Sequence, residues 1–164
     1  MKNNIILIGP PGVGKSTVGV LFAKECSRPF VDTDILIQAV EGRRLQDILD
    51  SDGADRFREV EEQRILQLDL DNHVIATGGS VVYSPAAMAH LKAGSTTVFL
   101  NLPCDALLSR IDNLETRGVV LPTSQTFHDM YEERLLLYRR YADAEVDCTG
   151  LNHEQVVRRI VSVL

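Results

Sequence analysis

The chain is poor in the features that hold together small secreted proteins and metal-binding modules. It has three cysteines in 164 residues, with no C-x-x-C pair and no matched cysteine–histidine spacing. This excludes a disulfide framework and gives no indication of a zinc site. The four histidines are scattered without ligand spacing, so we expect no metal or catalytic role for them. No apolar run is long enough to cross a membrane.

Positive charge is also scarce. The sequence has 17 Lys and Arg against 23 Asp and Glu, which gives a formal net charge of −6. Broad affinity for nucleic acid or an anionic membrane needs clustered Lys and Arg, so we expect neither partner, although a local pocket can still bind a small phosphorylated ligand. The start MKNNIILIG lacks the basic start and cleavage pattern of a signal peptide, so we expect a cytoplasmic protein.

Strand-like and helix-like segments alternate along the chain without repeats or linkers. This alternation predicts a single α/β domain over residues 1–164, with a five-stranded parallel sheet flanked by helices in three layers. Ligands of such sheets bind beyond the carboxyl ends of the strands. The predicted strands are 4–8, 29–32, 73–77, 96–102 and 144–148, and the predicted helices are 15–26, 34–41, 45–51, 53–70, 85–92, 104–112, 125–141 and 153–163.

The strongest motif is GPPGVGKST at residues 9–17. It fits G-x-x-x-x-G-K-[ST] and stands between the apolar run NIILI and a helix-like segment, as a phosphate loop requires. Glycines let successive backbone N–H groups point at phosphate oxygens, while Lys15 neutralises phosphate charge and Ser16 offers a hydroxyl to Mg²⁺. Thr17 is expected to add a phosphate contact. The alternative is a plain glycine turn with a solvated lysine.

Two carboxylates end the second predicted strand in the segment FVDTD. Asp32 could hold Mg²⁺ through a water molecule, and Asp34 could accept a hydroxyl proton from an alcohol that attacks a phosphate. The alternative for this pair is a helix cap or a solvated turn.

Further along the chain, Arg58 and Glu61 stand one helical turn apart and are expected to pair, which would hold the guanidinium ready for a carboxylate. The alternative is a solvated charged face. Gly78 and Gly79 follow the third strand and leave space for a ligand, or form only a tight turn. Arg134 is either a second anion-binding residue or an ordinary surface arginine.

The segment 112–124, DNLETRGVVLPTS, breaks the helical periodicity. It carries Arg117 between two helical stretches, as a mobile flap would, and a plain surface loop is the alternative.

Together these residues resemble the shikimate kinases over nearly the full chain. The ordered series is the phosphate loop, DTD, GRRLQDILDSDG before FREVE, TGG, an arginine in the flap, and then ER followed by LLY and YAD. The resemblance implies a nucleoside-monophosphate-kinase-like P-loop kinase domain, with a substrate-binding segment at about 33–61 and a mobile lid at about 112–124. It also implies transfer of the ATP γ-phosphate to the 3-hydroxyl of shikimate, with Mg²⁺ as cofactor and a monomeric protein.

The resemblance also implies a role for each matching residue. The catalytic residues would be Lys15, Asp34 and Arg117, and the metal residues would be Ser16 and Asp32. The nucleotide-binding residues would be Gly12, Val13, Gly14, Lys15, Ser16, Thr17, Arg110 and Arg117. The substrate-binding residues would be Asp34, Arg58, Gly78, Gly79 and Arg134, with the two arginines gripping the substrate carboxylate.

The chain departs from the family pattern at three places. Ser80 replaces the third glycine of a triple-glycine stretch, the flap reads RGVVLP, and Leu136 replaces a proline. These departures leave open a kinase of another small hydroxylated carboxylic acid, and an ATP-binding switch without catalysis is the alternative from another class.

Overall fold

The fold is described by a computed structural model that covers residues 3–110 and 125–164. Its strands are β1 (Ile5–Ile8), β2 (Phe30–Asp32), β3 (Val74–Ala76), β4 (Thr96–Asn101) and β5 (Ala144–Asp147). Its helices are α1 (Lys15–Glu25), α2 (Thr33–Glu41), α3 (Leu45–Leu66), α4 (Pro85–Lys92), α5 (Cys104–Leu108), α6 (Phe127–Tyr141) and α7 (His153–Val163), with the 3₁₀ helix η1 (Val81–Tyr83).

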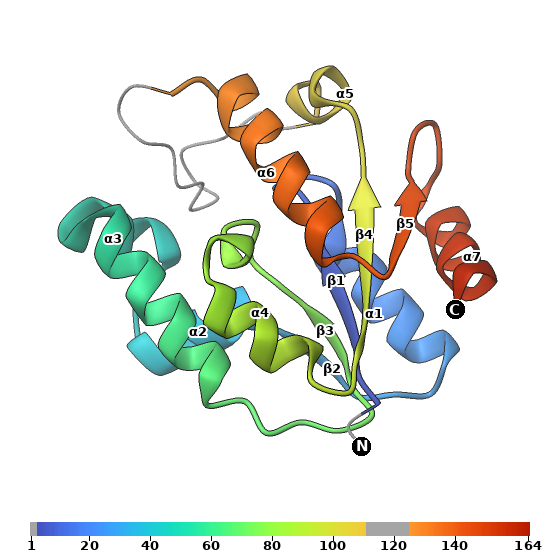
Figure 1. Cartoon of the computed structure of the whole chain (residues 1–164), viewed down its shortest axis with the longest axis horizontal. Coiled ribbons are helices and arrows are strands. Elements are labelled where there is room, and N and C mark those ends of the chain that lie inside the picture. The colour runs from blue at the N-terminus through green and yellow to red at the C-terminus, as the bar shows by residue number, and fades with distance from the viewer. Residues whose placement is uncertain (1–2, 111–124) are drawn as a thin grey trace.

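The five strands form one parallel sheet in the order β2-β3-β1-β4-β5, which confirms the predicted α/β class (Figure 1). The chain leaves the central strand β1 toward β2 at one edge, returns through β3, and crosses to β4 and β5 on the other side of β1. This change of direction makes the carboxyl end of β1 the point where a ligand-binding crevice is expected.

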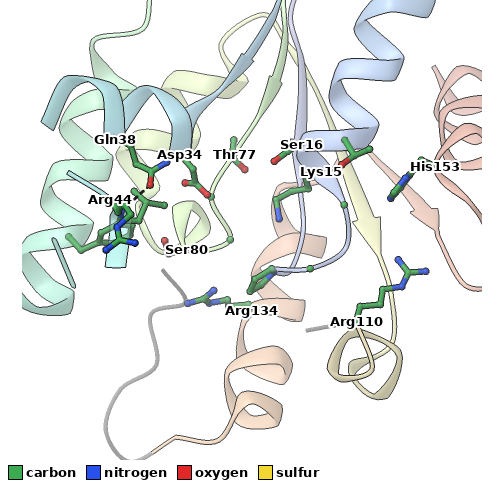
Figure 2. Close-up of a pocket in the computed structure, with 18 of the residues that line it drawn as sticks. Lys15, Ser16, Asp34, Gln38, Arg44, Thr77, Ser80, Arg110, Arg134 and His153 are labelled. Carbon is green, nitrogen blue, oxygen red and sulfur yellow. Dashed lines mark hydrogen bonds between the residues drawn. The ribbon is translucent and has the colours of Figure 1, made fainter. Parts of the chain in front are cut away.

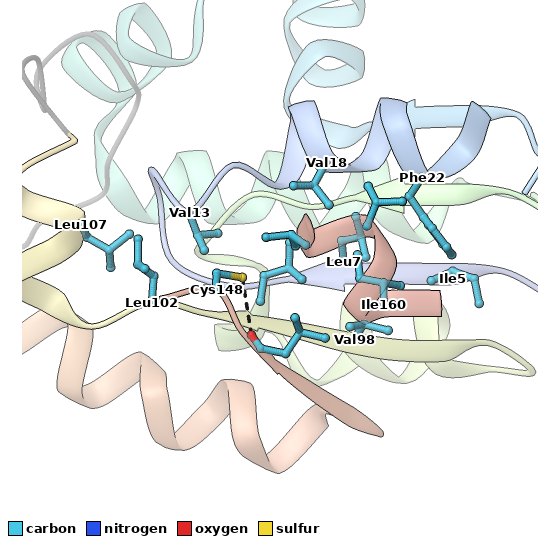
Figure 3. Close-up of a cluster of buried hydrophobic side chains, with 14 of the residues drawn as sticks. Ile5, Leu7, Val13, Val18, Phe22, Val98, Leu102, Leu107, Cys148 and Ile160 are labelled. Atoms are coloured by element: carbon cyan, nitrogen blue, oxygen red, sulfur yellow. Dashed lines mark hydrogen bonds between the residues drawn. The ribbon is translucent and has the colours of Figure 1, made fainter. Parts of the chain in front are cut away.

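Alternate residues of β1 pack into two separate cores, because successive side chains of a strand point to opposite faces. Ile5 and Leu7 belong to the cluster that includes Val18 of α1 and Ile160 of α7 (Figure 3). Ile6 and Ile8 belong to a second cluster, which includes residues of α4 and Tyr138 of α6. The sheet is therefore covered on both faces.

A third, smaller cluster joins α2 to α3 and contains Ile37, Ile48 and Phe57. The expected break between helices 45–51 and 53–70 is confirmed, because α3 consists of two helical stretches that meet at a kink at Gly53, where φ is 85° and ψ is 169°. The expected end at residue 70 is wrong, since the helix ends at Leu66. The expected helix 104–112 is also too long, since α5 ends at Leu108. No helix in the described ranges is long and apolar enough to cross a membrane.

Candidate active site

A cavity of about 750 Å³ opens beyond the carboxyl ends of the central strands (Figure 2). Residues that follow β1, β2 and β3 meet there with residues of α3, α6 and the start of α7. Its lining is formed by Pro11, Gly12, Gly14, Lys15, Ser16, Thr17, Asp34, Gln38, Arg44, Leu45, Phe57, Thr77, Gly78, Gly79, Ser80, Arg110, Arg134, Leu151, Asn152 and His153.

The predicted phosphate loop forms one side of this cavity. Gly12 (φ 86°) and Gly14 (φ 103°) adopt the left-handed backbone conformation that favours glycine. Gly14 is the N-cap of α1, and no side chain caps this helix, so the first backbone N–H groups of α1 are open to an anion. The positive end of the helix dipole adds to this preference.

Lys15 is buried beneath the loop, with 8% of its surface exposed. Its ammonium donates hydrogen bonds to the carbonyl oxygens of Gly9 (2.7 Å) and Pro10 (2.9 Å). Burial lowers the pKa of Lys15 to about 8, and the nearby carboxylates of Asp34 and Asp32 oppose this shift. The lysine is therefore held by two neutral acceptors that an anionic phosphate oxygen can replace.

The other predicted nucleotide residues divide into two groups. Ser16, Thr17 and Arg110 line the cavity, whereas the Val13 side chain is buried in the core and its backbone N–H donates to the carbonyl of Pro10 (3.4 Å). Only the loop backbone at Val13 thus remains near a nucleotide. His153 also lines the cavity, although no motif pointed to it.

The two carboxylates of FVDTD have different tasks. Asp32 is buried and caps α2, because its Oδ1 accepts hydrogen bonds from the backbone N–H groups of Asp34 (2.9 Å) and Ile35 (3.2 Å). Asp34 projects from the first turn of α2 into the cavity. The pKa of Asp34 is raised to about 6, chiefly by burial and then by the charge of Asp32, while Lys15 opposes the shift. The helix-cap alternative therefore holds for Asp32 but not for Asp34.

The backbone at Gly78 passes between two carboxyl groups. A Cβ atom at this position would lie 2.5 Å from Glu61 Oε1 and 2.7 Å from Asp34 Oδ1, so a side chain there would displace one of them. The position needs glycine for space, which explains why the two acidic groups can approach the same stretch of backbone. The neighbouring Ser80 donates a hydrogen bond from its hydroxyl to Glu61 Oε2 (2.7 Å).

Glu61 is the most buried acid of the site, with 3% of its surface exposed. Its pKa is raised to about 7, chiefly by burial and then by the charge of Asp34, while the Ser80 hydrogen bond and the charges of Arg134 and Arg58 oppose the shift. The predicted pairing of Arg58 with Glu61 is wrong as a contact, since the described residues include no hydrogen bond or ion pair between them. The two side chains interact only through the electrostatic effect of their charges.

Helix α6 brings Arg134 into the cavity lining, where the residue is almost fully buried, with 2% of its surface exposed. A Cβ atom added at Gly79 would lie 3.2 Å from Arg134 Nη1, and the carbonyl of Gly79 accepts a hydrogen bond from Tyr138 Oη (2.7 Å). Arg134 is therefore a buried cation beside the glycine turn, not a surface arginine.

Arg58 is not among the residues that line the cavity, although its chain neighbour Phe57 is. Its guanidinium carbon stands 4.7 Å from the centroid of the Tyr83 ring. Arg117 and the predicted lid at 112–124 lie outside the described residues, so both remain predictions.

The oxygen groups at the phosphate loop and at the end of β2 fit a magnesium ion held partly by a phosphorylated ligand. In residues 3–110 and 125–164 there is no cluster of three or more His, Cys, Asp or Glu side chains that could enclose a metal. The Ser16 hydroxyl lines the cavity, and the carboxylate of Asp32 is close enough to Lys15 and Asp34 to influence the pKa of both. One hydroxyl and one nearby carboxylate suit Mg²⁺, which keeps several waters and commonly binds substrate phosphates.

Comparison with known proteins identifies the family of this chain. A family model described as shikimate kinase matches residues 11–164. The chain belongs to the shikimate kinase family. It is 37% identical to the shikimate kinase of Pseudomonas entomophila over 164 residues, covering 98% of this chain and 95% of that protein. It is 33% identical to the enzyme of Clostridium botulinum (strain Eklund 17B / Type B), covering 100% of this chain and 98% of the relative.

The solved structures agree with this family membership. The shikimate kinase from Acinetobacter baumannii in complex with shikimate matches with a TM-score of 0.91 and 27% identity, over 99% of this chain and 93% of that one. The family is one of ATP-dependent kinases that transfer phosphate to an alcohol, so the chain is an enzyme with a P-loop kinase fold.

Several residues of the site escaped the sequence reasoning. Tyr83 and His153 belong to no motif, and Tyr138 closes the LLY stretch without a role assigned to it; their places beside the arginines, the phosphate loop and the glycine turn arise only from the fold. Ser80 was noted as an added side chain, but its hydrogen bond to Glu61 could not be foreseen, because the partners are 19 residues apart on different elements.

Proposed function

We propose that the protein transfers the γ-phosphate of ATP to the 3-hydroxyl of shikimate, giving shikimate 3-phosphate and ADP. The observation that carries the proposal is the shared cavity, in which a complete phosphate loop faces the carboxylate of Asp34 and the buried guanidinium of Arg134. A phosphate donor site alone would fit many nucleotide-binding proteins. The carboxylate and the arginine beside it provide for an acceptor that is both an alcohol and an acid.

The nucleotide side of the cavity binds and neutralises the triphosphate. The open N-terminus of α1 and the loop backbone hold phosphate oxygens, and Lys15 exchanges its two carbonyl partners for the β and γ phosphates. The Ser16 hydroxyl, and Asp32 through a water molecule, would hold Mg²⁺, which when bound offsets the charge on the phosphates. Arg110 at the cavity rim is assigned to the adenine side.

Asp34 prepares the acceptor hydroxyl for attack. Its carboxyl projects into the cavity, and its pKa of about 6 leaves it ionised at neutral pH but closer to the proton affinity that a general base needs. The acceptor carboxylate binds at Arg134, with Arg58 behind it, and the backbone of Gly78 and Gly79 lines the ring of the acceptor. Arg117 is proposed to approach the phosphates from the lid as charge develops.

The remaining attributes of the protein are also proposals. With a net charge of −6 and a cavity sized for small molecules, it acts as a cytoplasmic monomer without nucleic-acid or membrane partners, in the biosynthesis of chorismate and the aromatic amino acids.

The test is ADP formation by the purified protein with ATP and Mg²⁺, with shikimate present or withheld. We expect turnover that depends on shikimate, with product shown by ³¹P NMR to be a phosphate monoester. Turnover only with another hydroxy acid would support the kinase mechanism but show that shikimate is not the acceptor. Ser80 would then be assigned a role in acceptor specificity. ATP binding without turnover on any acid of the panel would overturn the proposal in favour of a non-catalytic switch.

A further inference from the structure

One aromatic ring contacts both arginines of the acceptor side. Tyr83 ends η1, directly after the TGGS turn, and its ring centroid lies 4.7 Å from Cζ of Arg58 and 5.1 Å from Cζ of Arg134. Arg134 Nε also donates a hydrogen bond to the Tyr83 hydroxyl (3.4 Å). The arginines come from α3 and α6, so the tyrosine joins two elements that are far apart in the sequence.

Little else fixes the guanidinium of Arg58. Its Nε is buried without a hydrogen-bond partner, and within the described part of the chain no ion pair or hydrogen bond holds its terminal nitrogens. Glu61, the acid expected to hold it, is hydrogen-bonded to Ser80 instead. The face of the Tyr83 ring is thus the contact that orients this side chain.

We infer that Tyr83 is a positioning residue for the acceptor carboxylate: its ring sets the orientation of Arg58 and Arg134 before the acceptor binds. The inference rests on the proposed function, because the carboxylate is that of the proposed acceptor. A guanidinium stacked on an aromatic face keeps its N–H groups at the edge, where they remain available to a carboxylate. The unpartnered Arg58 Nε is one such donor.

The physical gain is preorganisation. Arginine side chains lose rotamer freedom when they are immobilised by a ligand, and a platform that orders them in the free protein removes part of this loss from the binding step. The platform also keeps two like charges at a set separation. Glu61, which lowers their mutual repulsion, interacts with both of them electrostatically.

The kinetic test compares Tyr83→Leu, which removes the ring, with Tyr83→Phe, which removes only the hydroxyl. Because each cation–π contact contributes modestly, we expect Tyr83→Leu to raise the KM for shikimate roughly ten-fold, and Tyr83→Phe to change it by no more than about two-fold. The KM for ATP should stay within about two-fold in both variants. Tyr83→Thr serves as a second ringless variant if Tyr83→Leu does not fold, and equal KM values for ringless and Phe variants would overturn the inference.

A carboxamide analogue of shikimate separates positioning from general loosening of the pocket. In the wild type and in Tyr83→Phe, the acid should be preferred over the amide by the same factor, and in the ringless variant this preference should fall roughly ten-fold. In an Arg58→Ala background, the effect of removing the ring should shrink, because the two changes act on one interaction. An unchanged acid preference in the ringless variant would contradict the inference.

Arginine side-chain NMR tests the positioning role of Tyr83 without requiring activity. If the wild type did not phosphorylate shikimate, that result would count against the proposed function but not against this inference. In the free protein, the ¹H–¹⁵N signals of the Arg58 and Arg134 Nε groups, assigned with Arg58→Lys and Arg134→Lys, should be shifted by the Tyr83 ring current. In Tyr83→Phe, the Arg58 signal should keep this shift, whereas the Arg134 signal should also respond to the loss of its hydrogen bond to the Tyr83 hydroxyl. In the ringless variants, both signals should lose the ring-current shift. Identical signals in the wild type and the ringless variants would overturn the inference.

Discussion

The two sides of the cavity are built in different ways. The nucleotide side comes mostly from one run of nine residues, 9–17, whose glycines and helix N-terminus form a binding site by local geometry. The acceptor side is assembled from α2, α3, η1 and α6, none of which forms a site alone. A short sequence motif is therefore enough to predict the nucleotide side, whereas the acceptor side forms only when the chain folds.

The charges on the two sides also differ. On the nucleotide side, the buried ammonium of Lys15 donates its hydrogen bonds to neutral carbonyl oxygens, which an anion can replace. On the acceptor side, the carboxyl group of Glu61 interacts electrostatically with the guanidiniums of Arg58 and Arg134, while Asp34 interacts with Lys15 across the cavity. We therefore expect changes on the nucleotide side to affect every acceptor, and changes on the acceptor side to affect one substrate.

The largest expected effect is that of Lys15→Ala. Loss of the buried cation should lower kcat/KM by roughly 1,000-fold with any acceptor, because charge on the transferring phosphate is no longer neutralised. Steady-state ADP formation measures this. Lys24→Ala, on the exposed end of the same helix, is the matched control and should retain wild-type rates. A Lys15→Ala enzyme with near-normal activity would break the assignment of the phosphate loop.

Asp34→Asn should lower kcat by a few hundred-fold while the KM for ATP stays nearly constant, because the general base is lost and the nucleotide site remains. In the wild type, the base must be ionised, so kcat should fall as the pH drops through about 6, the pKa of Asp34. Asp55→Asn, on the exposed surface of α3, should leave the profile unchanged. A pH profile that is flat between 5 and 8 would remove Asp34 from this role.

Arg134→Lys should raise the KM for shikimate about 100-fold and change the KM for ATP little, because a lysine cannot reproduce the fork of donors that binds a carboxylate. Lysine is chosen over alanine so that the buried acids keep a positive neighbour. Arg140→Lys, exposed on the same helix, is the control. An equal rise in both KM values would indicate that the two sides are not separable.

The last prediction concerns stability rather than catalysis. The pKa of Glu61 is raised from an ordinary value near 4.5 to about 7 in the folded protein, so its contribution to the free energy of unfolding is fully present below 4.5 and is lost as the pH rises through 7. The size of this loss is on the order of 3 kcal/mol. Glu61→Gln, compared with the exposed control Glu59→Gln, should flatten the decline in urea-unfolding free energy between pH 5 and 8. A decline as steep as in the wild type would show that Glu61 is not its source.

The sheet, the order of alternating elements and the phosphate loop could be predicted because each depends on local pattern. Ile5 to Ile8 form an uninterrupted apolar strand, and Gly14, Lys15 and Ser16 stand at fixed offsets from Gly9. Boundaries were less predictable. The break of α3 at Gly53 was predicted, but its end at Leu66 was not. The two stretches on either side of the break stay together because Ile48 and Phe57 pack into the same small core.

The acceptor side resisted prediction for a different reason. Helical spacing brings Arg58 near Glu61, but tertiary contacts determine their partners. Glu61 accepts a hydrogen bond from Ser80, and Arg58 packs against the ring of Tyr83. Asp32 and Asp34 are two residues apart, yet only the start of α2 settles which one caps the helix and which one enters the cavity. Sequence spacing cannot rank such competing partners.

The central claim, that an acceptor side specific for a carboxylate stands beside a separate nucleotide side, is tested most directly by calorimetric titration of shikimate without nucleotide. The titration should be done with the wild type, Lys15→Ala and Arg134→Lys. The account predicts that Lys15→Ala binds shikimate with a Kd within about three-fold of the wild type, while Arg134→Lys binds it about 100-fold more weakly. Equal losses in the two variants, or no loss in Arg134→Lys, would contradict it.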